Sequence, residues 1–466
     1  MRVSLISTNT AASPYPVFPL GCAVVANALR GSGHEVDIFD VMAEGGPEEK
    51  TLAKYAERLE RFKPGMVGIS IRNVDNVNVL EEETFLDVPN RVVRAVRRAA
   101  PGVPIVLGGS GFSIMPEKML ERLGADYGVA GEGEKAVVEL AAEIAAGRRP
   151  EKRIWRSEPL RGDGTAWRIM GAYYPSSLLD FYNSSGSIAP VQTKRGCPNH
   201  CVYCSYPFLE GREIRPRPPE EVLEEMRFLR DERGVDFVFF TDSVFNDAAG
   251  EYLKLLETLE QAELDIPWTA FFQPSEDLTP ELAERLVAAG LHSVELGVDA
   301  ASDKALKAMG KSFTFDLAKR CNDVFAGRNV AVANYFMMGG PGETRETVEE
   351  GIKNIEGLEN AVSFVFLGVR VLPGTPLLKL AIDEGVVPPD ADFTSPVYYF
   401  SPRLDREWLE KRLDETLSRI KRCVYPPNSM DAGIALLRKM GYRGNLWEMM
   451  VPGSKRLPPK NDASRA

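Results

Sequence analysis

The feature that most constrains the fold is a repeated alternation of short apolar segments with amphipathic helical segments. The first series begins with an expected strand at Val3–Ser7 and an expected helix at Leu20–Arg30. A second series begins at Ser187 and supplies a further set of strand–helix units. Such alternation produces parallel sheets that are covered by helices. The chain is therefore predicted to be an α/β protein with a doubly wound (Rossmann-like) N-terminal sheet, followed by a partial (β/α)6 barrel.

The same pattern predicts how the 466 residues divide into segments. The N-terminal sheet is expected at 1–150, a linker at 151–185, the partial barrel at 186–385, a small and mainly helical C-terminal segment at 386–451, and a disordered tail at 452–466. The linker is predicted because turn-forming residues replace the periodic pattern there. The tail is predicted because it is rich in Pro, Lys and Ser.

Charge and hydropathy exclude several classes of protein. The chain has 56 basic and 67 acidic residues and a net charge of -11, which argues against a general nucleic-acid or anionic-membrane binder. No apolar run is long enough to span a bilayer. The N-terminus begins directly as a strand-like segment, without the pattern of a secretory signal. A cytoplasmic protein is therefore expected.

Three of the six cysteines lie close together in the sequence TKRGCPNHCVYCSY. Cys197, Cys201 and Cys204 form a C-x3-C-x2-C pattern on the loop after the first expected barrel strand. Three thiolates can bind three irons of a 4Fe–4S cubane and leave the fourth iron open to another ligand. The alternative is a zinc site, but zinc usually takes four protein ligands in a structural site, and only His200 is near enough to be the fourth. The spacing therefore favours an iron–sulfur cluster.

This cysteine motif resembles that of the radical S-adenosylmethionine superfamily. The resemblance implies that the open iron binds the amino and carboxylate groups of S-adenosylmethionine, which is cleaved to a 5′-deoxyadenosyl radical. Four further motifs are similar to those of the superfamily's cobalamin-binding branch: TDSVFN after the second barrel strand, SVELGVDAA on the fourth, MMGGPGET on the fifth, and Arg370 with PGTP after the sixth. The S-adenosylmethionine contacts that these resemblances imply are Tyr203, Asp242, Ser243, Glu295, Gly339, Gly340 and Pro341. Asp299 replaces the Glu or Gln that is common in the fourth motif, and Arg370 is expected either to meet a carboxylate or to form a structural ion pair.

The N-terminal domain resembles the cobalamin-binding domain of the same branch, so that the resemblance covers roughly residues 1–380. Its matching pieces are glycine-containing turns at the ends of the expected strands. The cobalamin contacts that it implies are Leu20, Ser70, Arg72, Asn73, Gly108, Gly109, Ser110, Gly111, Gly131, Glu132 and Gly133. The glycines are expected to let the backbone approach the cofactor. The chain lacks an Asp-x-His-x-x-Gly sequence, as does this branch, which implies a cobalt with no histidine below it.

The function implied by the resemblance is methylation of an unactivated carbon in a small molecule or lipid, through a 5′-deoxyadenosyl radical and methylcobalamin. It also implies an external electron donor such as flavodoxin or ferredoxin. One alternative is a radical enzyme of the same architecture that catalyses a rearrangement or carbon–carbon bond formation, with or without cobalamin. Another is a cobalamin-binding module with a vestigial barrel. No residue is predicted to be catalytic, and the substrate is not evident from the sequence.

Overall fold

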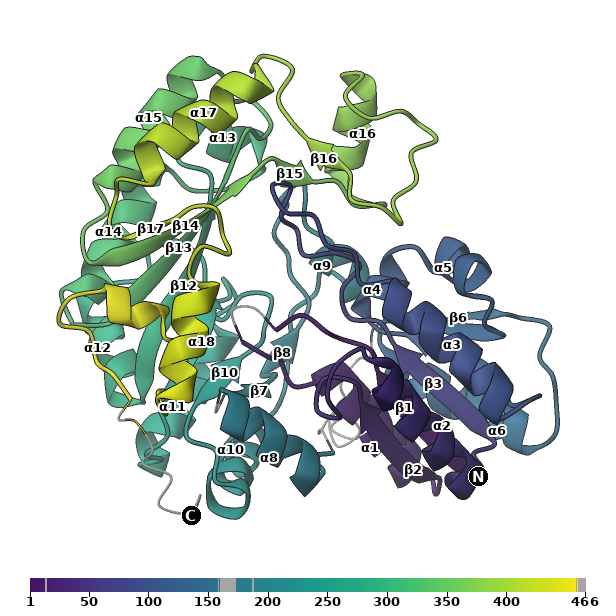
Figure 1. The fold of residues 1–466 in the computed structure, drawn as a ribbon. Coiled ribbons are helices and arrows are strands. Elements are labelled where there is room, and N and C mark those ends of the chain that lie inside the picture. The colour runs from purple at the N-terminus through teal and green to yellow at the C-terminus, as the bar shows by residue number, and fades with distance from the viewer. Residues whose placement is uncertain (13–14, 158, 160–172, 187, 458, 460–466) are drawn as a thin grey trace.

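The computed structural model describes residues 1–12, 15–157, 159, 173–186, 188–457 and 459. Two α/β domains face one another in this structure, with the N-terminal domain on the right of Figure 1 and the larger second domain on the left. Both domains are built on parallel sheets, as the alternating sequence pattern predicts.

The N-terminal domain contains a six-stranded parallel sheet in the order β2-β1-β3-β4-β5-β6. Its strands are β1 (Arg2–Ser7), β2 (Glu35–Asp40), β3 (Met66–Ser70), β4 (Ile105–Gly108), β5 (Tyr127–Ala130) and β6 (Ile154–Arg156). Its helices are α1 (Leu20–Gly31), α2 (Glu49–Phe62), α3 (Asp87–Ala99), α4 (Ser110–Ile114), α5 (Pro116–Leu123) and α6 (Gly133–Ala145). Helix α1 packs against α6 and helix α2 against α3, and each helix follows a strand of the sheet. The predicted doubly wound fold is confirmed.

Part of the predicted linker has regular structure. Strand β6 pairs with β5 from Gly128↔Ile154 to Ala130↔Arg156 and so extends the N-terminal sheet beyond residue 150. Helix α8 (Ser176–Ser185) then begins immediately after Pro175, and its buried Tyr182 donates a hydrogen bond to Asp40 of β2 over 3.1 Å. Strand β6 could not be predicted from periodicity, because three residues are too few to show an alternation. Two of the turn-forming residues behind the linker prediction, Gly162 and Gly164, lie outside the described part of the chain.

The second domain contains a seven-stranded parallel sheet in the order β17-β14-β13-β12-β11-β10-β7. Its strands are β7 (Ala189–Val191), β10 (Val238–Phe240), β11 (Trp268–Phe272), β12 (Leu291–Asp299), β13 (Ala331–Met338), β14 (Ala361–Leu367) and β17 (Cys423–Val424). Two-stranded sheets are formed by β8 (Lys194–Arg195) with β9 (Arg215–Pro216), and by β15 (Val369–Arg370) with β16 (Tyr398–Tyr399). The expected strand segments are confirmed as the first six strands of a partial barrel, and β17 adds an edge that the sequence did not show.

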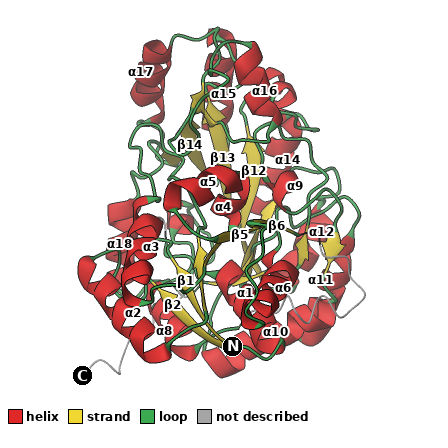
Figure 2. Cartoon of the chain, turned by 90° about the vertical axis from the view of Figure 1, so that its right-hand side faces the viewer, coloured by secondary structure: helices red, strands yellow, loops and turns green. Residues whose placement is uncertain are grey.

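Helices cover the outer face of the barrel sheet, as the perpendicular view shows for α14 and α15 around β12–β14 (Figure 2). The helices are α9 (Tyr206–Leu209), α10 (Pro219–Arg233), α11 (Glu251–Ala262), α12 (Pro280–Ala288), α13 (Asp303–Ala308), α14 (Phe315–Ala326), α15 (Arg345–Glu356) and α16 (Pro376–Asp383). Pro219 and Pro280 occupy the first helical positions, where a missing N–H is tolerated, as predicted. Because helices cover the outer face of the sheet, every second side chain of each strand points to the inside of the barrel.

The last part of the C-terminal segment packs against the starts of strands β13 and β14. It contains α17 (Arg406–Leu417), α18 (Asp431–Lys439) and a 3-10 turn η1 (Trp447–Met450). The mainly helical character predicted for 386–451 is interrupted after Leu417, because Cys423 and Val424 pair with Ser363 and Phe364 of β14. Trp447 and Val451 pack against Val362 and Phe364 in one buried cluster. In the predicted tail, residues 458 and 460–466 lie outside the described part of the chain.

Among the residues that the structure describes, no helix is both long enough and apolar enough to cross a membrane.

Candidate active site

A cavity of about 1550 Å³ lies between the two domains. Ligand pockets for single small molecules measure about 300–1,000 Å³, so this cavity has room for more than one ligand. Most of the predicted residues line it, including the whole set assigned to the N-terminal domain. The predicted residues in the lining are Leu20, Ser70, Arg72, Asn73, Gly108, Gly109, Ser110, Gly111, Gly131, Glu132, Gly133 and Glu295. The remaining predicted residues, all of them described, are not among those that line the cavity.

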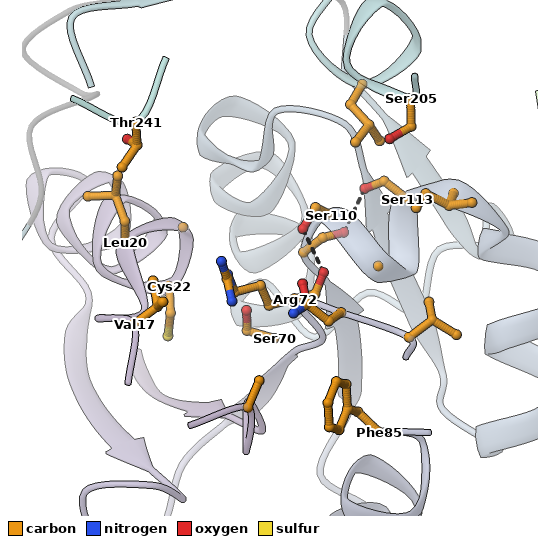
Figure 3. Close-up of a pocket in the computed structure, with 18 of the residues that line it drawn as sticks. Val17, Leu20, Cys22, Ser70, Arg72, Phe85, Ser110, Ser113, Ser205 and Thr241 are labelled. Atoms are coloured by element: carbon orange, nitrogen blue, oxygen red, sulfur yellow. Dashed lines mark hydrogen bonds between the residues drawn. The ribbon is translucent and has the colours of Figure 1, made fainter. Parts of the chain in front are cut away.

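The N-terminal wall of the cavity is made of loops that follow β3, β4 and β5, at the carboxyl edge of the sheet, where ligands of doubly wound sheets bind. Figure 3 shows Ser70, Arg72 and Ser110 close together, with Leu20 and Cys22 of α1 on one side and Phe85 on another. The hydroxyl of Ser110 donates to the Arg72 carbonyl over 2.8 Å, and the Ser113 hydroxyl donates to the Gly109 carbonyl over 2.8 Å. These bonds fix the two loops against each other.

The glycines of this wall are required by contacts within the protein. Gly109 has φ of 98°, and a Cβ at this position would lie 2.5 Å from the Ile71 carbonyl oxygen. A Cβ on Gly111 would lie 3.1 Å from the Arg72 carbonyl oxygen, and one on Gly133 would lie 3.0 Å from Val25. We expected these glycines to give room to a cofactor. In the structure they let two loops and a helix approach one another, so that backbone faces the cavity, and their contact with a cofactor stays a prediction.

Glu132 belongs to a buried ion-pair network between the domains. It pairs with both Arg195 of β8, at 3.2 Å, and Arg215 of β9, at 3.1 Å. Arg195 also donates to Glu134 of α6 over 2.6 Å. All four side chains are buried. The carboxylate of Glu132 is thus engaged by two guanidinium groups, and its predicted contact with cobalamin remains a prediction.

These arginines hold the two strands that flank the cysteine loop. The chain leaves β8 at Gly196, passes through Cys197, Cys201 and Cys204, forms the short helix α9 and returns as β9. Gly196 has φ of 88°, and a Cβ there would overlap the Glu213 carbonyl. The Cys197 N–H donates to the Gly211 carbonyl over 3.1 Å, and the Cys204 N–H donates to the Cys201 carbonyl over 3.2 Å. The loop is therefore closed on itself and tied to the N-terminal domain at its base.

The three thiols are near enough to influence one another. Burial, together with the smaller effect of the charges of Cys201 and Cys197, raises the pKa of Cys204 to about 12. Among the described residues, no three His, Cys, Asp or Glu side chains surround a position for a single metal ion. A cubane does not require such a position, since each of its thiolate ligands binds a different iron. Three cysteines on one ordered loop fit the three-thiolate ligand set that the sequence predicts.

Asp242 supports the start of the cysteine loop. Its Oδ1 accepts hydrogen bonds from the backbone N–H of Thr193, at 2.7 Å, and of Lys194, at 3.2 Å. Its Oδ2 accepts from the Thr193 hydroxyl and lies 3.4 Å from Lys194 Nζ. The carboxylate is 2% exposed. The structure thus shows Asp242 supporting the cysteine loop, and its contact with S-adenosylmethionine stays a prediction. The neighbouring Ser243 donates to Glu210 over 3.1 Å.

A second charged group lies beside the cysteines. The Tyr203 hydroxyl donates to Asp299 Oδ2 over 2.5 Å, and Lys311 forms an ion pair with the same carboxylate. Lys311 Nζ also donates to the Gly297 carbonyl over 3.2 Å. Its ammonium lies 5.7 Å from the Tyr203 ring centre. The backbone of Asp299 has φ of 68°, a left-handed conformation that is uncommon for a residue other than glycine. The strand end that resembles the ribose-contacting motif is therefore held in a specific shape.

The predicted glycine motif at Gly339, Gly340 and Pro341 is supported by a buried carboxylate. Glu343 Oε2 accepts hydrogen bonds from the N–H groups of both glycines. Burial raises the pKa of Glu343 to about 7, and the two backbone N–H groups oppose this rise. The sequence left open whether Arg370 meets a ligand carboxylate or forms a structural ion pair. In the structure it forms an ion pair, because its Nε donates to the buried Asp75 over 2.7 Å.

The barrel wall of the cavity is formed by inward-facing side chains. Glu295 of β12 is 4% exposed and accepts a hydrogen bond from the Tyr335 hydroxyl over 3.0 Å. Burial raises the pKa of Glu295 to about 7, and the hydroxyl of Tyr335 opposes this rise. Several other residues that line the cavity were not predicted from the sequence, since isolated aromatic and charged residues carry no motif. They are Tyr15, Arg195, Glu210, Phe271, Tyr335, Phe364 and Trp447.

Comparison with known proteins agrees with this architecture. The model of the B12 binding domain matches residues 6–141, and the model of the Radical SAM superfamily matches residues 191–355. Tryptophan 2-C-methyltransferase of Streptomyces laurentii is 27% identical to this chain, over 82% of this chain and 74% of its own length. Cytidylyl-2-hydroxyethylphosphonate methyltransferase of Streptomyces wedmorensis is 26% identical, over 81% and 80% respectively.

Among solved structures, the radical S-adenosylmethionine methyltransferase TsrM of Kitasatospora setae, with cobalamin and a [4Fe-4S] cluster bound, superposes with a TM-score of 0.82. It is 25% identical, and the match covers 96% of this chain and 97% of that one. The two domain matches follow one another in the order of the two sheets described above, and the cysteine loop lies within the second match. The chain belongs to the radical S-adenosylmethionine enzymes that carry an N-terminal cobalamin-binding domain.

Proposed function

We propose that this protein methylates a carbon atom of a small-molecule or lipid substrate, with S-adenosylmethionine as the methyl source. The observation that carries the proposal is the shared cavity, to which the B12-type sheet and the inner face of the barrel each contribute one wall. A substrate in that space lies against both domains. The methyltransferase names of the similar proteins support the same reaction.

The residues present are suited to the cofactors of this reaction. Cys197, Cys201 and Cys204 would hold a 4Fe–4S cluster, and the backbone of the wall at Gly108–Gly111 would face cobalamin. When bound, the cluster supplies an electron to S-adenosylmethionine, and cobalamin supplies a metal that carries methyl groups. Tyr203, Asp299 and the Gly339–Gly340 turn would position S-adenosylmethionine beside the cysteines. An external reductant such as flavodoxin or ferredoxin is required by this scheme, and the cytoplasm is the expected location.

The protein's own side chains prepare the site in three ways. The pairs of Glu132 with Arg195 and Arg215 hold the cysteine loop at a fixed place relative to the N-terminal sheet. Asp242 holds the first residues of that loop through backbone N–H groups. The C-terminal turn with Trp447 packs against the starts of β13 and β14 and so covers one end of the barrel sheet with apolar side chains. Each of these contacts is made between groups of the protein itself and holds a wall of the site in place.

The test is turnover of the cobalamin- and cluster-loaded protein with S-adenosylmethionine that carries a deuterated methyl group. Mass spectrometry should show that methyl group intact in the product, together with S-adenosylhomocysteine, and 5′-deoxyadenosine reports the radical route. Changing Cys197, Cys201 and Cys204 together to Ala should abolish 5′-deoxyadenosine. The same triple change at Cys22, Cys321 and Cys423 is the matched control and should preserve it. A changed but unmethylated product would reject methyl transfer in favour of another radical reaction.

A further inference from the structure

An ion pair between Lys311 and Asp299 lies against the cysteine loop. The side chain of Lys311 is 9% exposed and that of Asp299 is 17% exposed, so that both charges are largely removed from solvent. Neither residue is among those that line the cavity between the domains. Because the desolvation of two charges offsets their attraction, a buried ion pair contributes little net stability. The pair therefore calls for an explanation other than stability of the fold.

Several contacts hold the ammonium group of Lys311 in one place. Its Nζ donates to the Gly297 carbonyl over 3.2 Å as well as to the Asp299 carboxylate. The same carboxylate oxygen accepts a hydrogen bond from the Tyr203 hydroxyl over 2.5 Å. Tyr203 itself belongs to the cysteine loop, where it lies between the last two cysteines. The position of the ammonium is thus tied to the loop through a chain of two hydrogen bonds.

The backbone that leads into Lys311 packs against the same loop. The Val202 N–H donates to the Met309 carbonyl over 3.0 Å. Gly310 has φ of 77°, and a Cβ at this position would overlap the His200 carbonyl. Glycine is therefore required for the close approach of the two backbones. This approach brings the side chain of the next residue, Lys311, beside the cysteines.

The charge of Lys311 acts on all three thiols. Burial raises the pKa of Cys197 and of Cys204, and in both cases the charge of Lys311 opposes the rise. Burial disfavours the charged form of Lys311, but Asp299 and Cys201 outweigh burial, so that the pKa of Lys311 is raised. The ammonium is also near enough to Cys201 to form a hydrogen bond with its sulfur. Lys311 is therefore a permanent positive charge at the sulfur ligands.

A positive charge at this place favours the reduced form of a cluster. A doubly charged 4Fe–4S core with three thiolates carries one net negative charge, and the electron accepted from the external donor increases it to two. The reduction potential of such clusters depends on their net charge, on hydrogen bonds to the sulfurs and on exposure to solvent. A buried ammonium stabilises the more negative, reduced form, whereas a buried carboxylate favours the oxidised form.

We propose that Lys311 and Asp299 set the reduction potential of the cluster at Cys197, Cys201 and Cys204. Lys311 raises the potential, and Asp299 limits the rise. Both residues act through the charges that they place beside the cysteines. The inference rests on the cluster assignment within the proposed function, but it does not depend on methyl transfer, because the cluster must be reduced before it can cleave S-adenosylmethionine in any radical reaction.

The experiment measures the midpoint potential of the reconstituted cluster by electron paramagnetic resonance during reduction with titanium(III) citrate, in the absence of S-adenosylmethionine. Lys311→Met should reduce the equilibrium constant for one-electron reduction about 10-fold, which lowers the potential by about 59 mV. Asp299→Asn should raise the potential by a similar amount, because the ammonium loses its counter-charge. The variant that carries both changes should return close to the potential of the unchanged protein.

Two further variants separate charge from structure. Lys311→Arg keeps the positive charge and should shift the potential less than half as much as Lys311→Met. Lys307→Met is the matched control, because it removes an exposed charge from α13, four residues before Lys311. Solvent and salt screen that charge, so its removal should leave the potential unchanged. Iron and sulfide analysis and the absorption spectrum verify that each variant contains a cluster.

The sign of the shifts decides the outcome. Opposite shifts in Lys311→Met and Asp299→Asn support the inference, since a loosened loop would not respond to the sign of the charge that was removed. Equal potentials in all variants, or shifts of the same sign in both, would overturn it and leave methyl transfer intact. If Lys311→Met binds no cluster, Asp299→Asn decides alone, and a potential that does not rise would overturn the inference. Absence of a cluster from the unchanged protein would instead reject the proposed function.

Discussion

The two walls of the central cavity are built on different principles. The N-terminal wall consists largely of backbone from glycine-containing turns, such as the one at Gly108–Gly111, and Glu132 beside it is fully engaged by Arg195 and Arg215. The barrel wall consists of side chains, and its one central carboxylate, Glu295, has a hydroxyl donor and no cationic partner among the described residues.

This difference separates the constant part of the site from its selective part. A wall of backbone whose shape depends on glycine can change little without loss of the fold, so it suits a ligand that the whole family shares. A wall of side chains on a rigid sheet can change from one protein to another without altering the scaffold. The comparison predicts that substitutions in the N-terminal wall act first on stability, whereas substitutions in the barrel wall act first on ligand binding.

The largest effect is expected from Glu132→Ala. This change leaves Arg195 and Arg215 buried without that partner, and removal of one member of a buried ion pair costs about 3–5 kcal/mol. The free energy of unfolding, measured by urea denaturation, should fall by this order. Glu143→Ala, which removes an exposed pair with Arg148, is the control and should change the denaturation midpoint very little. A similar small change for both variants would show that the network between the domains does not stabilise the fold.

The next effect concerns the glycine turns. Gly109→Ala places a Cβ 2.5 Å from the Ile71 carbonyl oxygen in a backbone with φ of 98°, and such strain costs about 1–3 kcal/mol. Thermal unfolding should therefore occur at lower temperature, and cobalamin loading should fall because the loops separate. Gly102→Ala is matched in backbone conformation, with φ of 78°, but a Cβ there meets nothing within 4 Å. If both variants lose cobalamin equally, backbone strain alone explains the loss, and the close approach of the loops is not required.

The sequence predicted the N-terminal wall of the cavity better than the barrel wall. The alternating pattern predicted both sheets, and the strand-end motifs predicted the N-terminal wall, because the position of a turn along the chain also determines its place at the sheet edge. Cys197, Cys201 and Cys204 were identifiable because their spacing is short. The partners Arg195 and Arg215 lie more than 60 residues from Glu132 and carry no motif. The cavity-lining residues Phe271, Tyr335 and Phe364 were also not predicted, since Phe and Tyr in strands usually belong to the core.

A smaller effect of opposite sign is expected in the barrel wall. Glu295→Gln removes a buried carboxylate that lacks a cationic partner and retains an oxygen atom for the Tyr335 hydroxyl. At about pH 8 the free energy of unfolding should rise by about 1 kcal/mol, because ionising a buried carboxyl is costly. Urea denaturation measures this change. Glu132→Gln, which removes the same charge from the paired site, should destabilise the protein, and a gain in stability from both variants would contradict the contrast between the walls.

The smallest expected effect is the pH dependence of the stability that Glu295→Gln gains over the unchanged protein. The pKa of Glu295 is about 7 in the folded protein and about 4.5 in the unfolded chain, so the folded protein binds more protons between these values. Its contribution to stability is therefore complete below about pH 4.5, falls as the pH rises, and is lost above about pH 7. Glu295→Gln cannot titrate, so the stability difference between variant and unchanged protein should grow between about pH 5.5 and about pH 8. The pKa of Glu343 is raised to the same value, so Glu343→Gln should show the same pH trend. This carboxylate accepts two backbone N–H groups, so its replacement should not give the gain in stability expected for Glu295→Gln. A pH-independent difference in stability for Glu295→Gln would mean that the Glu295 carboxyl has the same pKa in the folded protein as in water. That outcome would contradict the burial of an unpaired acid in the barrel wall.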